Sequence, residues 1–163
     1  MFKKLDRIYH EFPPKFWVLV GASFIDGIGG TLLFPFFALY LTQKFGIGMT
    51  QAGILLGMFS LAGLVGTMIG GALTDRFGRK NLLLFGLVFS ALSTLSIGMA
   101  NSLAVMYPLA LFVGLLSNMG HPAHQAMVAD MLPEEKRPEG FSVMRVVFNL
   151  AWIIGPTIGG VVA

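Results

Sequence analysis

The sequence predicts an all-α membrane protein, on the basis of its hydropathy, the length of its apolar runs and the placement of its charges. Hydrophobic residues make up 55% of the 163 residues, charged residues make up 12%, and the mean hydropathy is +0.78. An average soluble domain has about 25% charged residues. A helix of about 20 apolar residues crosses a bilayer. The apolar runs are continuous rather than alternating, so helices are expected and a transmembrane β-barrel is not.

Five apolar runs are long enough to be transmembrane helices, and a basic tail precedes the first of them. The first run exceeds the apolar part of a signal peptide, about 7–15 residues, so we expect it to be retained. The last run is still apolar where the sequence stops, and we expect a fragment of a longer protein or a truncated reading frame. The expected tail is 1–15 and the transmembrane region is 16–163, with spans at about 16–42, 51–73, 81–100, 103–131 and 141–163.

Lysine and arginine residues collect on one side of the predicted spans. Nine lie in the tail and after spans two and four, whereas one lies after span one and none after span three. Positive charge collects on the cytoplasmic side, so the N-terminus is expected to be cytoplasmic. The expected location of the protein is a bacterial-type inner membrane. The basic composition therefore reflects topology, and no nucleic-acid partner is expected. The nine are Lys3, Lys4, Arg7, Lys15, Arg76, Arg79, Lys80, Lys136 and Arg137, and the single one is Lys44.

The composition also excludes several kinds of chemistry. Cysteine is absent, which removes disulfides, thiol nucleophiles and thiolate metal sites. No Walker loop, zinc motif, serine elbow or nucleophile–base pair is visible. We therefore expect no enzyme, no cofactor and no metal site.

Asp26 is the only acidic residue well inside a predicted span. A carboxylate at mid-membrane is costly unless it is paired, wetted or protonated. The adjacent glycines 27, 29 and 30, and Pro35 further along, are expected to interrupt the first span. Asp26 is predicted to be a proton or substrate-cation site, and the alternative is a polar residue near a water-filled mouth.

His121 and His124 lie three residues apart and share one face of span four, which is expected to be kinked near Pro108 and Pro122. Histidine titrates near neutral pH, so a proton relay is one interpretation. A polar cavity lining or an interhelical hydrogen bond is the interpretation that we prefer.

Arg145 and Asn149 lie one turn apart at the start of span five. The Arg145 side chain could extend to the cytoplasmic surface. It could also pair with an acid of another span, such as Asp26 or Asp130, and the sequence leaves both possibilities open.

The charged segment between spans two and three resembles a motif of the major facilitator superfamily. It runs Gly71-Ala-Leu-Thr-Asp75-Arg76-Phe-Gly78-Arg79-Lys80 and resembles the family pattern G-x-L-x-D-R-x-G-R-[KR]. The resemblance implies that Asp75 and Arg79 join an acid at the end of span four, here Asp130, in a conformational latch of the outward-facing state. Gly71, Arg76, Gly78 and Lys80 complete the motif.

Two further segments bear on the kind of transporter. Gly155-Pro156-Thr-Ile-Gly159-Gly160 resembles an element of span five that is typical of proton-coupled drug exporters, with Ala151 at its usual upstream glycine. In span four, Ala110 stands where such exporters have an arginine that takes part in proton coupling. The usual coupling residue is therefore missing, and Asp26 or Arg145 could replace it.

The resemblance implies the first part of a twelve-helix fold that carries a small-molecule substrate between two halves. We expect proton-coupled efflux of small amphipathic compounds by alternating access. The expected partners are the lipid bilayer, the substrate, protons and the C-terminal spans of the full transporter. The alternative, which the early end of the chain favours, is a non-transporting scaffold or assembly partner built on a partial bundle.

Overall fold

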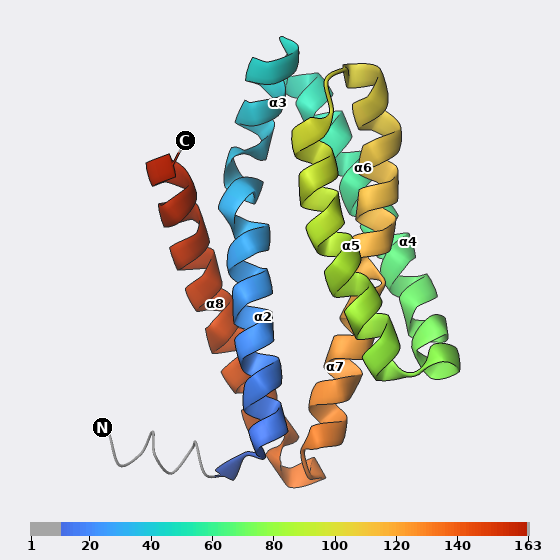
Figure 1. Cartoon of the computed structure of the whole chain (residues 1–163), viewed down its shortest axis with the longest axis vertical. Helices are drawn as coiled ribbons and strands as arrows, with labels where there is room; N and C mark the ends of the chain where they lie inside the picture. The colour runs from blue at the N-terminus through green and yellow to red at the C-terminus, as the bar shows by residue number, and fades with distance from the viewer. Residues whose placement is uncertain (1–10, 163) are drawn as a thin grey trace. The chain divides into compact units, whose positions relative to one another are not determined.

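The structure is a computed structural model that describes residues 11–162 (Figure 1). This part of the chain is helical and contains no strand. The elements are α2 (Pro14–Leu33), η1 (Phe34–Phe36), α3 (Phe37–Phe45), α4 (Met49–Phe77), α5 (Arg79–Met99), α6 (Leu103–Asn118), α7 (Gly120–Met131), η2 (Glu134–Lys136) and α8 (Arg137–Val162). Five stretches are long and apolar enough to cross a membrane: Pro14–Phe45, Met49–Phe77, Arg79–Met99, Leu103–Met131 and Glu134–Val161. The predicted all-α class with about five spans is confirmed.

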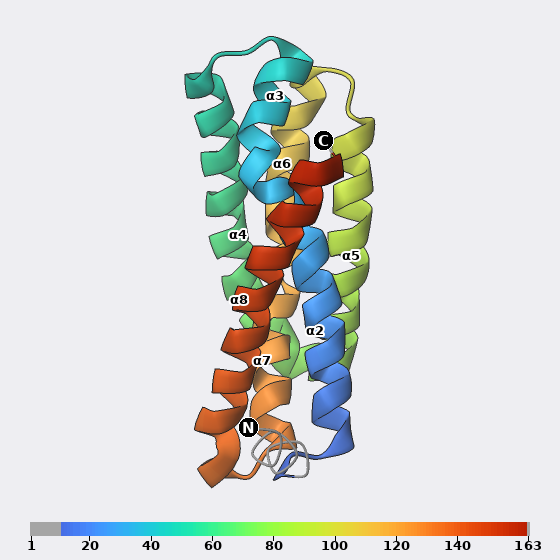
Figure 2. The same cartoon turned by 90° about the vertical axis from the view of Figure 1, so that its left-hand side faces the viewer.

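The helices form two units by their contacts, and the first unit comprises the described residues 11–33 and 127–162. Within it, α2 and α8 lie side by side (Figures 1 and 2). A Cβ atom built on Gly27 would lie 3.0 Å from the Cβ atom of Ala151. The Thr31 hydroxyl lies 2.7 Å from the Gly27 carbonyl oxygen and 2.9 Å from that of Ala151. Its single proton can be donated within α2 or across to α8, so Thr31 joins the helices beside the glycine contact.

The second unit comprises residues 34–126, and in it α4 packs closely against α6. A Cβ atom at Gly66 would collide with the Leu115 carbonyl group, and one at Gly114 would collide with the Phe59 carbonyl oxygen. Each helix therefore presents a glycine to the backbone of the other. In lipid, where no hydrophobic effect drives helices together, such close approach supplies the van der Waals attraction.

In the same unit, α5 packs against α6 and the start of α7. Gly86 and Gly120 face each other, since a Cβ atom at Gly86 would lie 2.7 Å from the Gly120 Cα atom. The hydroxyl oxygens of Ser93 and Ser117 are 3.0 Å apart and link α5 to α6. An apolar cluster packs α3 against α4 and α6 in this unit. Its buried members are Leu41, Ala52, Leu55, Ala100, Met106 and Ala110.

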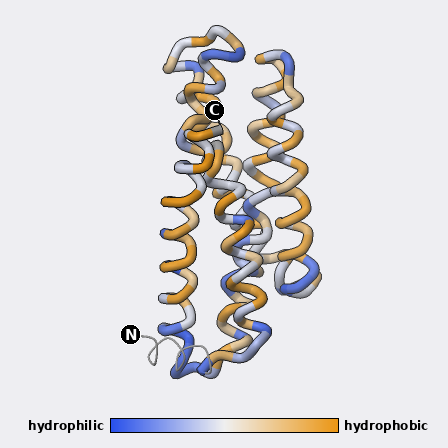
Figure 3. Tube along the Cα trace, turned by 60° about the vertical axis from the view of Figure 1, so that its left-hand side comes forward, coloured by the Kyte–Doolittle hydropathy of each residue, from blue (hydrophilic) through white to orange (hydrophobic). Residues whose placement is uncertain are grey.

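The helices extend past the apolar runs from which the spans were predicted. α4 includes residues 74–77 after the range 51–73, and α8 begins at Arg137 rather than near residue 141. Backbone hydrogen bonding continues through polar residues because it does not depend on side-chain hydropathy. Figure 3 shows hydrophobic residues along the helices and hydrophilic residues gathered near the turns.

The first span is interrupted at Pro35, as expected, but not at the glycines beside Asp26. α2 continues as a helix through Asp26 and the three glycines beside it, so the interruption predicted there is wrong. The helix breaks at η1, which has Pro35 at its centre. Glycine keeps its backbone N–H and can remain in the helical hydrogen-bond ladder, whereas proline has no N–H to donate.

The two prolines of span four have different effects. Pro108 lies inside α6 without ending it, whereas the helix axis is broken at Met119, between α6 and α7. Pro122 lies in the first turn of α7, where a backbone N–H needs no helical partner. The break thus precedes Pro122, and it lies next to the contact of Gly86 with Gly120.

We expect Gly66→Ala to destabilise the second unit by about 1–3 kcal/mol, because the added methyl group must displace the Leu115 backbone. Gly53→Ala is the matched control on the same helix, since nothing in the described structure lies within 4 Å of a Cβ atom at Gly53. Thermal unfolding of the purified protein in detergent measures both. Equal melting temperatures for the two variants would contradict the close contact between α4 and α6.

Candidate functional site

The charged motif folds as a turn of a single residue between two helices. Asp75 and Arg76 lie in the last turn of α4, and Arg79 and Lys80 begin α5. Gly78 separates the helices with φ +84° and ψ 147°, a conformation that side chains strongly disfavour. Its N–H donates to the Thr74 carbonyl oxygen over 3.1 Å. The motif glycine thus ends one helix and starts the next within one residue.

Within the second unit, Arg79 connects this turn to α7. Its Nη1 atom donates to the Ala126 carbonyl oxygen over 3.3 Å, and the side chain is half-buried. The Arg76 guanidinium lies 5.6 Å from the centre of the Phe77 ring, whereas the Asp75 side chain is exposed. The two motif arginines therefore have different surroundings, one against a backbone carbonyl and the other over an aromatic ring.

Asp130, the expected third member of the latch, belongs to the first unit and lies near the end of α7 with an exposed side chain. The Arg137 Nε atom donates over 3.0 Å to the carbonyl oxygen of Ala129, the residue before Asp130. Carbonyls in the last turn of a helix have no helical donor, so Arg137 satisfies one of them and fixes the segment that carries Asp130.

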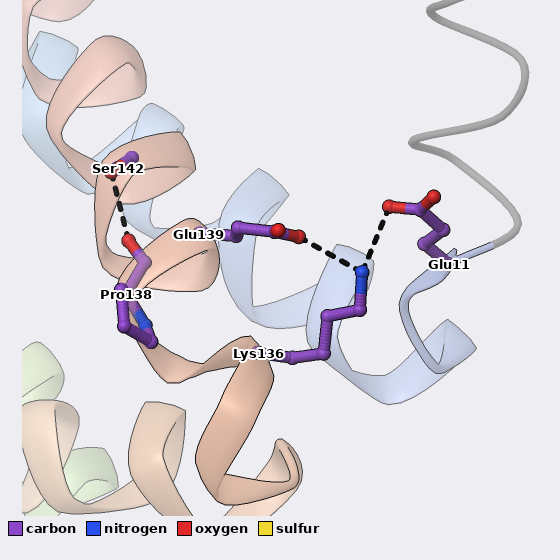
Figure 4. Close-up of polar contacts among 5 residues, drawn as sticks. All are labelled: Glu11, Lys136, Pro138, Glu139 and Ser142. Carbon is purple, nitrogen blue, oxygen red and sulfur yellow. Dashed lines mark hydrogen bonds and ion pairs between the residues drawn. The ribbon is translucent and has the colours of Figure 1, made fainter.

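A small ion-pair cluster lies beside Arg137 in the first unit (Figure 4). The Lys136 Nζ atom is 3.3 Å from Glu11 and 3.1 Å from Glu139, which places it between two carboxylates. The Ser142 hydroxyl donates to the Pro138 carbonyl oxygen over 2.8 Å at the start of α8. Lys136 thus connects the segment before α2 to the start of α8, a role that its position in a charged loop did not reveal.

Asp26 lies on α2 with an exposed side chain. It precedes Gly27, which is buried against α8, and neighbouring residues of a helix point about 100° apart. The carboxylate therefore lies on a different face of α2 from the one that contacts α8.

His121 and Gln125 form a polar pair one turn apart on α7. The distance from the Gln125 Nε2 atom to the His121 Nδ1 atom is 3.4 Å, and both side chains are exposed. His124 is half-buried on the same helix. Among residues 11–162, no group of three or more His, Asp or Glu residues could hold a metal ion.

Arg145 and Asn149 are exposed on α8, one turn apart. The residues of α8 that are buried against its neighbours, among them Met144 and Ala151, point to a different side of the helix. Arg145 and Asn149 therefore lie on a different side of α8 from these buried residues.

The span-five motif supplies the close contact between α8 and α2. A Cβ atom at Gly155 would collide with the Thr31 hydroxyl, and one at Gly159 would collide with the Leu32 carbonyl oxygen. Pro156 lies inside α8 without ending it, and Gly160 is exposed. Gly155 and Gly159 are therefore closely packed against α2, and the sequence signal that could have located their partner is Thr31, one turn after Gly27.

Ala110 is buried in the apolar cluster of the second unit together with Leu41 and Leu55. This is the position at which the resemblance places an arginine in proton-coupled exporters. A guanidinium group in this cluster would be surrounded by apolar side chains without a partner, at high cost. The departure from the exporter pattern at Ala110 thus agrees with its surroundings.

Comparison with known proteins gives the family of the chain. The sequence model of the Major Facilitator Superfamily matches residues 19–163. The chain therefore belongs to this superfamily of membrane transporters, and the resemblance to this family is confirmed.

Three bacterial relatives illustrate the range of the family. A Na(+), Li(+), K(+)/H(+) antiporter of Planococcus maritimus is 36% identical over 148 residues, which are 88% of this chain and 34% of the antiporter. The quinolone resistance protein NorA of Staphylococcus aureus is 26% identical over 149 residues, 91% of this chain and 38% of NorA. The uncharacterized MFS-type transporter YqjV of Bacillus subtilis is 26% identical over 151 residues, 93% of this chain and 37% of YqjV. The chain spans about a third of the length of these relatives.

Gly78→Ala is expected to destabilise the motif turn by about 1–3 kcal/mol, because alanine must adopt a backbone conformation that is essentially restricted to glycine. Gly71→Ala is the matched control within the motif, since a Cβ atom there has open space and no positive φ. Limited proteolysis at the turn and thermal unfolding measure the difference. If Gly71→Ala were as destabilising as Gly78→Ala, the backbone explanation would be wrong.

Proposed function

We propose that the protein is a secondary active transporter that exports small amphipathic compounds in exchange for protons. Membership of the superfamily and the drug-resistance relative NorA support this proposal. The observation that carries it is Asp26, an acidic side chain in an apolar helix, away from the face that packs against α8. A carboxylate inside a membrane-spanning helix is favourable only when it is protonated, wetted or paired with a cation.

Asp26 is the group that we propose takes up and releases the proton. Proton binding would bias alternating access only through different affinities for the two states. The arginine that other exporters use in span four is absent, because Ala110 stands at that position inside an apolar cluster. His121, His124, Arg145 and Asn149 are proposed to contribute polar groups to the substrate or proton path.

Exchange of monovalent cations for protons is a second candidate, favoured by the relative that is 36% identical and is named as a Na(+), Li(+), K(+)/H(+) antiporter. A carboxylate in an apolar helix serves this reaction equally well, since it can bind either a proton or a metal cation. The two candidates differ in cargo and share Asp26 as the coupling group.

We propose that the charged turn controls the conformational cycle. Asp75 and Arg79 would join Asp130 in the outward-facing state, as the family motif implies. The excess of lysine and arginine in the tail and around this turn supports a cytoplasmic position for both, in a bacterial inner membrane. Lys44 would then lie on the external side.

Asp26→Asn is expected to abolish the dependence of transport on the proton gradient in the full-length protein, because an amide cannot bind and release a proton at neutral pH. The assay is export of a fluorescent amphipathic dye, with Na(+)-driven dequenching of a pH probe measured in parallel, in everted vesicles. Transport of the dye would support the exporter, whereas dequenching of the pH probe on addition of Na(+) would support the cation antiporter.

Glu135→Gln provides the matched control for Asp26, since Glu135 is an exposed carboxylate in the turn before α8. It should transport as the unmodified protein does. Full proton dependence in Asp26→Asn would remove Asp26 from the coupling mechanism, and both candidate functions would then need another acid.

For Asp75→Asn we expect a shift of the outward–inward equilibrium by roughly tenfold towards the inward-facing state. This corresponds to about 1.5 kcal/mol for a charge-assisted hydrogen bond that is made in one state only. Labelling of single cysteines on the two sides of the membrane measures the balance of states. An unchanged balance together with unchanged transport would refute the latch.

A further inference from the structure

The α2–α8 pair of the first unit consists of parallel helices (Figures 1 and 2). Contact pairs between the two helices ascend together along both of them. With the α2 residue first, the pairs are Gly27 with Ala151, Thr31 with Gly155, and Leu32 with Gly159. An α-helix rises by about 1.5 Å per residue, so the sequence neighbours of Gly27 and Ala151 lie at nearly the same height.

Asp26 and Trp152 project on the same side of this helix pair. Successive residues of a right-handed helix, viewed from its N-terminal end, are turned clockwise by about 100°. Asp26 is therefore turned anticlockwise from Gly27, which faces α8. Trp152 is turned clockwise from Ala151, which faces α2. Because the two contact directions point towards each other, these opposite turns bring both side chains to one side of the pair, about 3 Å apart in height.

This side of the helix pair is accessible in the described part of the chain. The Asp26 side chain is exposed, and Trp152 is 50% exposed. A Cβ atom at Gly29 or Gly30 would meet nothing within 4 Å, so open space follows Asp26 along α2. Gly30 lies one turn beyond Asp26 and shares its face of the helix. A carboxylate, an indole ring and room for a bulky group therefore occur together.

The chemistry of these groups favours an organic cation over an inorganic one. A carboxylate attracts any cation, and the face of a tryptophan ring attracts a cation more strongly than that of any other side chain. An alkali cation needs a shell of oxygen ligands to replace its hydration water. Among the described residues 11–33 and 127–162, this side of the pair presents an indole ring beside Asp26 rather than a ring of carboxylates.

Arg145 is the positive charge on the same side of α8, seven residues before Trp152. Seven residues are almost two turns, or about 10 Å along the axis. Asp26 lies about 3 Å from Trp152 in height and about 8 Å from Arg145. The carboxylate is therefore closer in height to the ring than to the guanidinium, and a cation at the ring lies where the attraction of Asp26 exceeds the repulsion of Arg145.

We propose that Asp26 and Trp152 together bind an amphipathic organic cation, with its charge beside the carboxylate, its apolar part over the indole ring and its bulk in the space at Gly30. The inference rests on the proposed export of amphipathic compounds and specifies their charge. Trp152 is then a specificity-determining residue, since its ring distinguishes an organic cation from a metal ion.

The test measures equilibrium binding of tetraphenylphosphonium, an apolar organic cation, to the purified full-length protein in detergent. Trp152→Leu should raise the Kd for this cation roughly tenfold, because a desolvated cation loses an aromatic face. Trp152→Phe keeps a smaller ring and should give an intermediate Kd, and it serves if Trp152→Leu fails to fold. Asp26→Asn should also weaken binding. The double variant should lose less than the two single losses combined, because both residues contact one ligand.

Two controls separate recognition of the charge from apolar contact and from general effects on α8. Tetraphenylborate is an anion of nearly the same shape, and Trp152→Leu should change its Kd less than that of tetraphenylphosphonium. Ile153→Ala is the matched variant, since Ile153 is exposed on α8 and points about 100° away from Trp152. It should leave the Kd for tetraphenylphosphonium unchanged.

Proton-dependent dye export, measured on the same variants, distinguishes this inference from the function on which it rests. Proton-dependent export by the unmodified protein, with the same Kd for tetraphenylphosphonium in Trp152→Leu and Trp152→Phe, would refute the site and leave the function. An absence of export together with the expected order of Kd values would refute the function and leave the site. The site is also refuted if the unmodified protein does not bind tetraphenylphosphonium, or if Ile153→Ala weakens binding as much as Trp152→Leu.

Discussion

Backbone contact at glycine is the constraint on which the rest of this structure depends. In lipid the apolar side chains gain little by leaving their surroundings, so helices associate where their backbones can approach closely. Gly66 and Gly114 provide that approach in the second unit, and Gly155 and Gly159 provide it in the first.

Backbone carbonyls near helix ends are the second recurring feature, and basic side chains satisfy several of them. In the described part of the chain, Arg137 donates to Ala129 at the end of α7, and Lys44 donates to Gly98 at the end of α5. Arg79 donates to Ala126 further inside α7. Arg79 and Arg137 also contribute to the charge asymmetry that orients membrane proteins, whereas Lys44 is the single basic residue after span one. A single charge can therefore set topology and stabilise a helix, because it lies at the polar ends of the spans where both effects operate.

The fold could be predicted from the sequence to the extent that it depends on hydropathy and on a specific motif. Apolar length gave five spans, and the motif around Asp75 gave the family. Gly155 and Gly159 lie four residues apart and contact α2 closely, yet Gly53 and Gly57 have the same spacing, and a Cβ atom at either would meet nothing within 4 Å in the described residues. Spacing shows that a helix has a flat face, whereas the presence of a partner depends on the tertiary arrangement.

The candidate site was less predictable because polar contacts depend on which side chains the fold brings together. The bond from Lys44 to Gly98 joins residues 54 positions apart, and no local pattern announces it. Interruption of the first span was predicted both around Asp26 and at Pro35, and it occurs only at Pro35, which lacks an N–H for the hydrogen-bond ladder. The contacts of the charged turn likewise give no information about the substrate. The motif around Gly78 specifies a backbone turn and an arginine on a neighbouring carbonyl, and neither contact selects a substrate. Asp26 is exposed on a different face of α2 from the one that packs against α8, and we propose that side chains of this kind determine what transporters that share this turn carry.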